Sequence, residues 1–104
     1  MAQFDVFRNP NASVSGYPLL LDVQSDLLAH FKRRVVVPLA PLDGIRGPVQ
    51  KQLTPTLEIN HKPMVMVTPL LAAIDTTSFG KAVASVGSYR TEIIAALDML
   101  FTGA

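Results

Sequence analysis

The chain has 104 residues, a length that suits one small domain built around one hydrophobic core. Apolar residues make up 49% of it and charged residues 16%, whereas charged residues are roughly a quarter of an ordinary soluble domain. Since a small domain has little interior, we expect an exposed apolar surface through which the chain self-associates. Nine basic and eight acidic residues give a net charge of +1, which argues against a protein held to nucleic acid by charge.

The chain contains no cysteine, which excludes disulfides and thiolate metal sites and fits a reducing compartment. The first residues, MAQFDVFRNPN, lack a long apolar core and include Asp5, so no signal peptide is predicted. No apolar run approaches the roughly 20 residues that span a bilayer. We therefore expect a cytoplasmic protein with no membrane contact.

Three strands are predicted in the first 40 residues. Residues 3–7 alternate polar and apolar side chains, which is typical of a half-buried strand. Residues 17–23 and 34–39 hold two apolar runs of strand length. Between these two runs lies a polar connection, Gln24–Arg34. The pattern predicts two buried strands that carry a presented loop.

A hairpin and one more short strand are predicted in the second half. Leu57–Asn60 and Met64–Thr68 are short β-rich runs joined by the turn-forming residues 60–63. The second run has apolar side chains on both faces, so we expect it to be buried on both, inside a barrel or in a subunit interface. A further short strand is predicted around Val83–Val86.

The C-terminal segment has the period of an amphipathic helix. Ser88 is a candidate N-cap at its start, and Gly103 predicts its end. Six apolar residues share one face, which we interpret as core packing: Ile93, Ile94, Ala96, Leu97, Leu100 and Phe101. The predicted fold class is α+β, mainly β, in which residues 1–104 form one domain with a small, closed or strongly bent antiparallel sheet and a C-terminal helix.

The apolar pair Leu27–Leu28 lies in the polar connection, where solvated residues are expected. The residues alone leave two interpretations open. Either the pair folds back onto the core, or it is presented to a partner as an exposed apolar patch.

The charged residues around this pair also have two interpretations. Arg33 and Arg34 are candidates to bind phosphate or an acidic partner. Alternatively, one arginine is exposed and the other pairs with a carboxylate such as Asp26. Asp22 and Asp26 suit acid–base chemistry in principle, but we favour turn capping.

Motifs of enzymes are missing from the sequence. There is no glycine-rich phosphate loop and no nucleophile elbow, and neither histidine has the spacing of a metal ligand. We expect His30 and His61 to lie in loops, exposed to solvent. The residues therefore predict a β-rich binding domain rather than an enzyme, with no cofactor and no metal site.

Several stretches together resemble one known family. They are QFxV from Gln3, DVQSD at residues 22–26 before the apolar pair, RRxVxPLA at residues 33–40, LxP at residues 53–55 and LxxLFxG at residues 97–103. The DVQSD and RRxVxPLA stretches are specific in combination, and the register runs without a gap from about Leu53 to the end. On these motifs the chain resembles the CcdB toxins of bacterial toxin–antitoxin modules over essentially its whole length.

The resemblance implies a small SH3-like antiparallel β-barrel of the CcdB/MazF type, with an added sheet, a C-terminal helix and a homodimeric assembly. The well-studied members are not enzymes. They bind the A subunit of DNA gyrase and trap it on cleaved DNA, which turns a topoisomerase into a source of double-strand breaks. A CcdA-like antitoxin with a disordered tail that folds along the dimer is implied as the second partner.

Carried over residue by residue, the resemblance implies a gyrase-contacting surface made of Leu27, Leu28, Asp98, Thr102, Gly103 and Ala104. Three of these depart from the family pattern. Thr102 stands where the well-studied toxins carry a tryptophan, Ala104 replaces a larger aliphatic residue, and Asp98 replaces an amide. Loss of an interfacial tryptophan reduces binding by roughly 2–4 kcal/mol, or roughly thirty- to a thousand-fold.

Two other functions stay open. The fold also resembles that of the MazF and Kid endoribonucleases, for which Arg33, Arg34 and Asp22 are the candidate catalytic groups. The other is a non-toxic homologue that retains antitoxin binding and co-repression, and the departed C-terminal tripeptide favours it.

Overall fold

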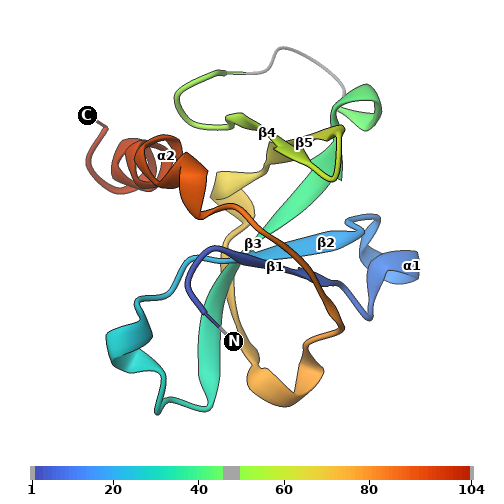
Figure 1. The fold of residues 1–104 in the computed structure, drawn as a ribbon. Coiled ribbons are helices and arrows are strands. Elements are labelled where there is room, and N and C mark those ends of the chain that lie inside the picture. The colour runs from blue at the N-terminus through green and yellow to red at the C-terminus, as the bar shows by residue number, and fades with distance from the viewer. Residues whose placement is uncertain (1, 46–49, 104) are drawn as a thin grey trace.

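The computed structural model describes residues 2–45 and 50–103, which form a curled antiparallel sheet with a long helix against it (Figure 1). The strands are β1 (Asp5–Arg8), β2 (Leu19–Asp22), β3 (Arg33–Pro41), β4 (Thr56–Ile59), β5 (Lys62–Met66), β6 (Ala72–Asp75) and β7 (Ala82–Ser85). The helices are α1 (Ala12–Ser15) and α2 (Arg90–Thr102). Short 3₁₀ turns lie between them: η1 (Asp26–Leu28), η2 (Leu42–Gly44), η3 (Thr68–Leu70), η4 (Thr76–Ser78) and η5 (Gly87–Tyr89). The predicted fold class, mainly β with one C-terminal helix, is confirmed.

β3 is the strand around which the sheet is organised. The strands hydrogen-bond in the order β4-β5-β3-β2-β1-β7, and β6 pairs with β3 as well. One edge of β3 pairs with β2, while residues 33–36 of its other edge pair with β6 and residues 39–41 with β5. Because β6 and β5 leave β3 at different ends, the sheet curls into a half-barrel. All seven strands of the described residues belong to this one sheet.

The predicted hairpin is formed by β4 and β5, with a tighter turn than expected. Asn60 and His61 have φ angles of 51° and 68°, the left-handed conformation that a two-residue turn between antiparallel strands favours. Met64, Val65 and Met66 are all buried. The prediction that this strand is covered on both faces is therefore confirmed.

The first strand differs from its predicted pattern. Phe7, which alternation placed on the solvent face, is buried, and its ring packs edge-on against Phe79 with 4.9 Å between centroids. The prediction was wrong because β1 lies inside the sheet between β2 and β7, where the segment before β7 covers its second face. Alternation within a strand indicates one covered face, and it cannot show that Phe79, 72 residues further along the chain, covers the other.

The start of α2 also differs from the prediction. Ser88 lies in η5, and the helix proper begins at Arg90 without a side-chain cap. Gly103 ends the helix as predicted, with φ of 73° and its N–H donating to the Met99 carbonyl. Glycine suits this position because it lacks the Cβ that makes a left-handed conformation unfavourable.

The apolar face of α2 is core only in part. Ile93 and Ala96 are buried against the sheet, whereas Phe101 is 70% exposed. The predicted stripe therefore divides into a packed half near the helix start and an uncovered end. The remaining core comes from the strands and the segments beside them: Phe4, Val6, Leu21, Val23, Val37, Leu39, Leu57, Ile59, Met64, Met66 and Val86. Within the described part of the chain, no helix has the length and apolarity to cross a bilayer.

Candidate functional site

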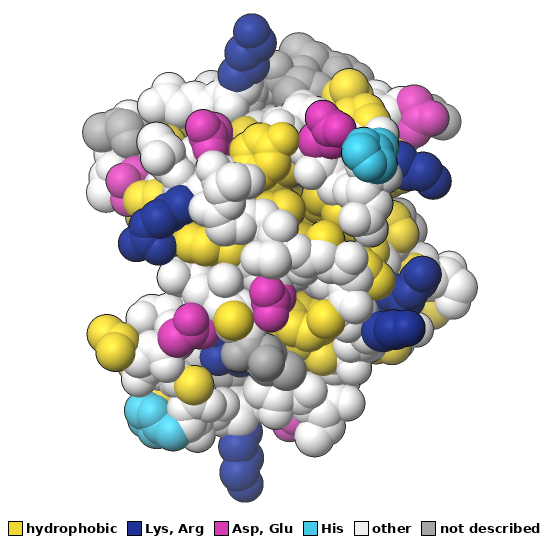
Figure 2. Space-filling model, in the orientation of Figure 1, with side chains coloured by type: hydrophobic (Ala, Val, Ile, Leu, Met, Phe, Trp, Pro, Cys, Tyr) yellow, Lys and Arg dark blue, Asp and Glu magenta, His cyan; other side chains and the backbone are white. Residues whose placement is uncertain are grey.

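The loop between β2 and β3 presents its leucines to solvent. The Leu27 side chain is 88% exposed and that of Leu28 is 42% exposed. Ser25 caps the turn that carries them, because its Oγ accepts a hydrogen bond from the Leu27 N–H at 3.2 Å. Figure 2 shows hydrophobic side chains protruding where this loop lies, at the lower left of the view. The sequence left open whether the pair folds back onto the core or is exposed. In the structure both leucines are exposed.

The Gln24 side chain fixes the shape of this loop, which we call the apolar loop (residues 24–33). Its amide nitrogen Nε2 donates to the carbonyls of Leu28 and Arg33, at 3.2 and 3.3 Å. Its amide oxygen Oε1 accepts from the Val35 N–H at 3.1 Å. One side chain thus ties both arms of the loop together, so the leucines are held on a formed turn.

A buried ion pair lies beneath the apolar loop. The Arg34 Nε lies 2.5 Å from the Asp22 Oδ2, and both side chains are almost fully buried. The Arg34 Nη2 also donates to the Gln24 carbonyl at 3.0 Å. The interpretation with one paired arginine and one exposed arginine is correct, but the main partner is Asp22, with Asp26 a second contact at 3.4 Å. Burial raises the pKa of the Asp22 carboxyl above its ordinary value, and the hydrogen bond from Arg34 opposes that rise.

The turn-capping prediction is confirmed for Asp22 and wrong for Asp26. Asp22 Oδ1 accepts the Gln24 N–H at 3.0 Å, two residues along the chain. Asp26 Oδ1 instead accepts the N–H of Gln3, from the N-terminal segment, at 2.9 Å. The capping oxygen next to Asp26 belongs to Ser25, so Asp26 connects the apolar loop to a distant part of the chain.

The N-terminal segment links the apolar loop to α2. The Gln3 side-chain amide donates to the Val23 carbonyl at 3.2 Å and accepts from the Arg90 Nη1 at 3.5 Å. The Arg90 guanidinium also lies over the Phe4 ring, 5.5 Å from its centroid. Sequence reasoning missed Gln3, Gln24 and Arg90, although the first two lie inside the quoted motifs.

The predicted residues of the C-terminus lie on the exposed end of α2. Asp98, Thr102 and Gly103 are exposed, and Ala104 lies outside the described residues. The Thr102 Oγ1 donates to the Asp98 carbonyl at 2.7 Å, one helical turn earlier. In Figure 1 this end of α2 and the apolar loop project from the same side of the molecule, at the upper left and the lower left of the view. The predicted contact residues of the loop and those of the helix end therefore lie on one side of the molecule, on separate elements.

The apolar loop also carries the aromatic side chain of Phe31, which is 53% exposed. The ring of His30 packs against it with 4.4 Å between centroids. Sequence reasoning placed no role on Phe31, although an aromatic residue in a polar connection was a usable signal. His30 and His61 are exposed, as predicted.

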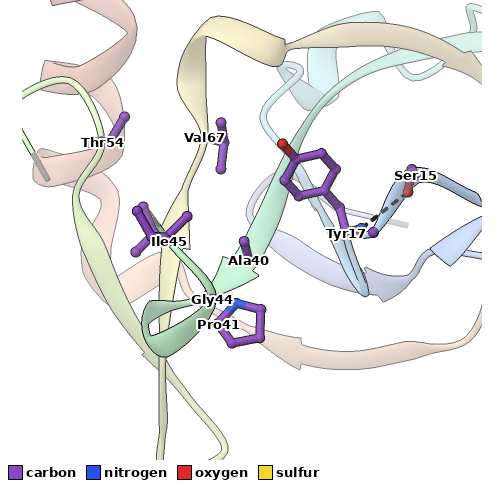
Figure 3. Close-up of a pocket in the computed structure, with 10 residues that line it drawn as sticks. Ser15, Tyr17, Ala40, Pro41, Gly44, Ile45, Thr54 and Val67 are labelled. Atoms are coloured by element: carbon purple, nitrogen blue, oxygen red, sulfur yellow. Dashed lines mark hydrogen bonds between the residues drawn. The ribbon is translucent and has the colours of Figure 1, made fainter. Parts of the chain in front are cut away.

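A cleft of 530 Å³ opens between the end of β3, the segment before β2 and the β5–η3 connection (Figure 3). Its walls are largely apolar, and Figure 3 shows Tyr17 and Val67 on opposite sides of it. Ser15, Tyr17 and Thr54 line it with hydroxyl groups, and no residue of its lining is acidic, basic or histidine. The lining offers no pair of groups for acid–base catalysis. Among residues 2–45 and 50–103, no cluster of three or more histidines and acidic residues is arranged to hold a metal ion.

Comparison with known proteins assigns the chain to a family. The family model described as CcdB protein matches residues 3–103. The chain belongs to the CcdB family. It is therefore the toxin component of a toxin–antitoxin module, as its motifs predicted. Among solved structures, the Mycobacterium tuberculosis toxin MazF-mt6 is similar with a TM-score of 0.64 and 15% identity, over 80% of this chain and 84% of that chain. That similarity is one of fold.

Proposed function

We propose that the chain poisons DNA gyrase by binding its A subunit as a homodimer and holding the gyrase–DNA cleavage complex, and that a CcdA-like antitoxin releases it. The observation that carries the proposal is Leu27, a large apolar side chain 88% exposed on a capped and tied turn. Membership of the CcdB family supports the toxin role, and the choice of gyrase as the target rests on the resemblance to the well-studied toxins. The toxin would act by protein–protein binding, with no covalent bond broken by its own residues.

Leu27 and Leu28 have the properties of anchors in such an interface. Full burial of a leucine side chain contributes roughly 1.5–3 kcal/mol, and a symmetric dimer brings two pairs. The apolar loop is already formed in the free chain, so little further ordering is needed on binding. Exposed apolar side chains on a formed loop are typical of a binding surface rather than of a solvated turn.

The end of α2 supplies the second group of proposed contacts: Asp98, Thr102, Gly103 and Ala104. Thr102 brings no ring to this surface, so we expect weaker binding than a family member with tryptophan there would show. Arg33, the exposed arginine, remains available for an acidic antitoxin segment, whereas the buried Arg34 does not.

A symmetric pair of chains is the proposed assembly. Leu70 on η3 and Phe101 on α2 are both exposed, by 47% and 70%, and η3 packs beside α2. This region is the candidate subunit interface, because an isolated monomer would leave it in contact with water. The high apolar content of the chain supports the same assembly.

Purified gyrase and supercoiled plasmid test the proposal. The wild-type chain should convert plasmid to linear DNA after denaturation of trapped gyrase, and Leu27→Asp should abolish this because a carboxylate cannot enter an apolar groove. Val14→Asp is the matched control, since Val14 on α1 is also 88% exposed and lies outside the proposed surface. Failure of the wild-type chain to trap gyrase, or equal activity of Leu27→Asp, would refute the proposal.

The endoribonuclease alternative takes its support from the structural similarity to MazF-mt6. Against it, Arg34 and Asp22 face each other inside the protein, where an RNA phosphate cannot reach them. Incubation of the folded chain with end-labelled single-stranded RNA should leave the RNA intact. Cleavage that disappears in Arg33→Ala would favour the alternative, whereas antitoxin binding without any effect on gyrase would favour a non-toxic homologue.

A further inference from the structure

The apolar loop concentrates the exposed apolar surface of the chain. Leu27, Leu28 and Phe31 are 88%, 42% and 53% exposed, and they lie within five consecutive residues. The other large exposed hydrophobic side chains of the described residues are scattered over α1, η2, η3 and α2: Val14, Leu42, Leu70 and Phe101. Phe31 is the aromatic member of the loop group, and the motifs of the sequence assign it no role.

The ring of Phe31 is held outward by the backbone of the loop. The Phe31 N–H donates to the Leu28 carbonyl at 3.1 Å, and the Leu28 N–H donates to the Ser25 carbonyl at 3.0 Å. The Leu28 carbonyl also accepts from the Gln24 amide. These bonds use the polar groups on the inner side of the loop, so the apolar side chains face solvent. The His30 ring, packed on that of Phe31, further limits its movement.

The surroundings of Phe31 indicate what kind of surface it fits. The charge of Asp26 on one side is offset by Arg34 and by the Gln3 N–H. On the other side, Lys32 and Arg33 are exposed. Asp75 on β6 lies opposite Arg33 in the sheet register, so this side carries both signs of charge. The loop thus has an apolar centre with a charged border, which suits a protein groove with an apolar floor and a polar edge.

We propose that Phe31 is a specificity-determining contact residue, which enters the same groove of the gyrase A subunit as Leu27 and Leu28. Phe31 lies three residues after Leu28 on the same formed loop, and both side chains are exposed, so a partner seated on Leu28 lies close to the ring. Phe31 thereby adds an aromatic ring to the interface at the apolar loop. The inference rests on the proposed function, since gyrase A is the occupant.

Binding of purified gyrase A to the full chain, measured by calorimetry, tests this inference. Phe31→Ala should raise the Kd at least tenfold without lowering the thermal unfolding temperature, because the ring touches solvent rather than the core. Phe31→Leu should raise the Kd by a smaller factor, since it keeps apolar surface without the ring. Val14→Ala, equally exposed as Leu27 but on α1, should leave the Kd within twofold.

The outcomes separate the inference from the function on which it rests. If Leu27→Asp abolishes binding while Phe31→Ala binds like wild type, the inference is overturned and the proposed function stands. If the wild-type chain does not bind gyrase A, both are overturned. An apolar loop with basic neighbours also suits an anionic lipid surface. Co-sedimentation with phosphatidylglycerol vesicles that Phe31→Ala abolishes, with gyrase affinity unchanged, would therefore overturn the inference in favour of a lipid contact.

Discussion

Two adjacent arginines have opposite environments. Arg34 is buried with its guanidinium against Asp22, whereas Arg33 is exposed on the same strand. Alternation along β3 explains the difference, since successive side chains of a strand point to opposite faces. Removal of one partner of a buried ion pair leaves an uncompensated buried charge, and that penalty is much larger than the loss of an exposed charge.

We expect Arg34→Met to lower the free energy of unfolding by about 3–5 kcal/mol, because Asp22 loses its counter-ion inside the protein. Arg33→Met should change it by about 0.5 kcal/mol or less. Urea denaturation followed by circular dichroism measures both. The double variant with Asp22→Leu and Arg34→Met should recover part of the loss, because no buried charge remains; equal stability of the two single variants would contradict the account.

Among the elements, the apolar loop depends on the side chain of Gln24. Three hydrogen bonds from this one residue join Leu28, Arg33 and the Val35 N–H. A polar loop of this length would otherwise sample many conformations, and two exposed leucines would tend to collapse onto the sheet. Gln24 therefore positions the leucines without belonging to the contact surface.

Gln24→Ala should weaken gyrase binding several-fold although no contact side chain changes. The unpaired Val35 N–H should also destabilise the fold by about 1–3 kcal/mol. Amide hydrogen exchange is the readout that separates positioning from general stability, and we expect it to accelerate selectively between residues 27 and 32. Gln52→Ala, at an exposed glutamine outside the apolar loop, is the control. Exchange that rises evenly over the whole sheet would point to a purely structural role.

The strands and the loop show which features the sequence predicted and which it did not. Apolar runs identified β2, β3 and the β4–β5 hairpin, because the core directly determines that signal. The buried face of Phe7 was missed, since its cover comes from Phe79, far along the chain. At the site, the residues alone did not decide between buried and exposed for Leu27–Leu28. That outcome depends on Gln24, whose partners include residues up to 11 positions away.

At the scale of the whole molecule, the curled sheet leaves one region of the helix layer uncovered. The first half of α2 packs on the core, but Phe101 at its end and Leu70 on the adjacent η3 are exposed. A domain of 104 residues has no further element among those described that covers them. A second copy of the chain would cover both and would also double the number of apolar loops.

Leu70→Asp should convert the proposed dimer to a monomer, because it places a carboxylate in an apolar interface. Light scattering after size-exclusion chromatography should then give a mass near the 11.2 kDa of one chain, and about twice that for wild type. Leu42→Asp is the control, since Leu42 is exposed to a similar degree, 39% against 47%. A wild-type chain that elutes as a monomer at micromolar concentration would contradict the proposed assembly.

We propose that this member of the CcdB family acts on gyrase by binding alone. The most direct test of this proposal is growth of cells that express the chain from an inducible promoter, in paired strains that carry wild-type or toxin-resistant gyrase A subunit. We predict that expression stops growth in the first strain and spares the second. Equal growth arrest in both strains, or unimpaired growth in both at confirmed expression of folded protein, would contradict the account.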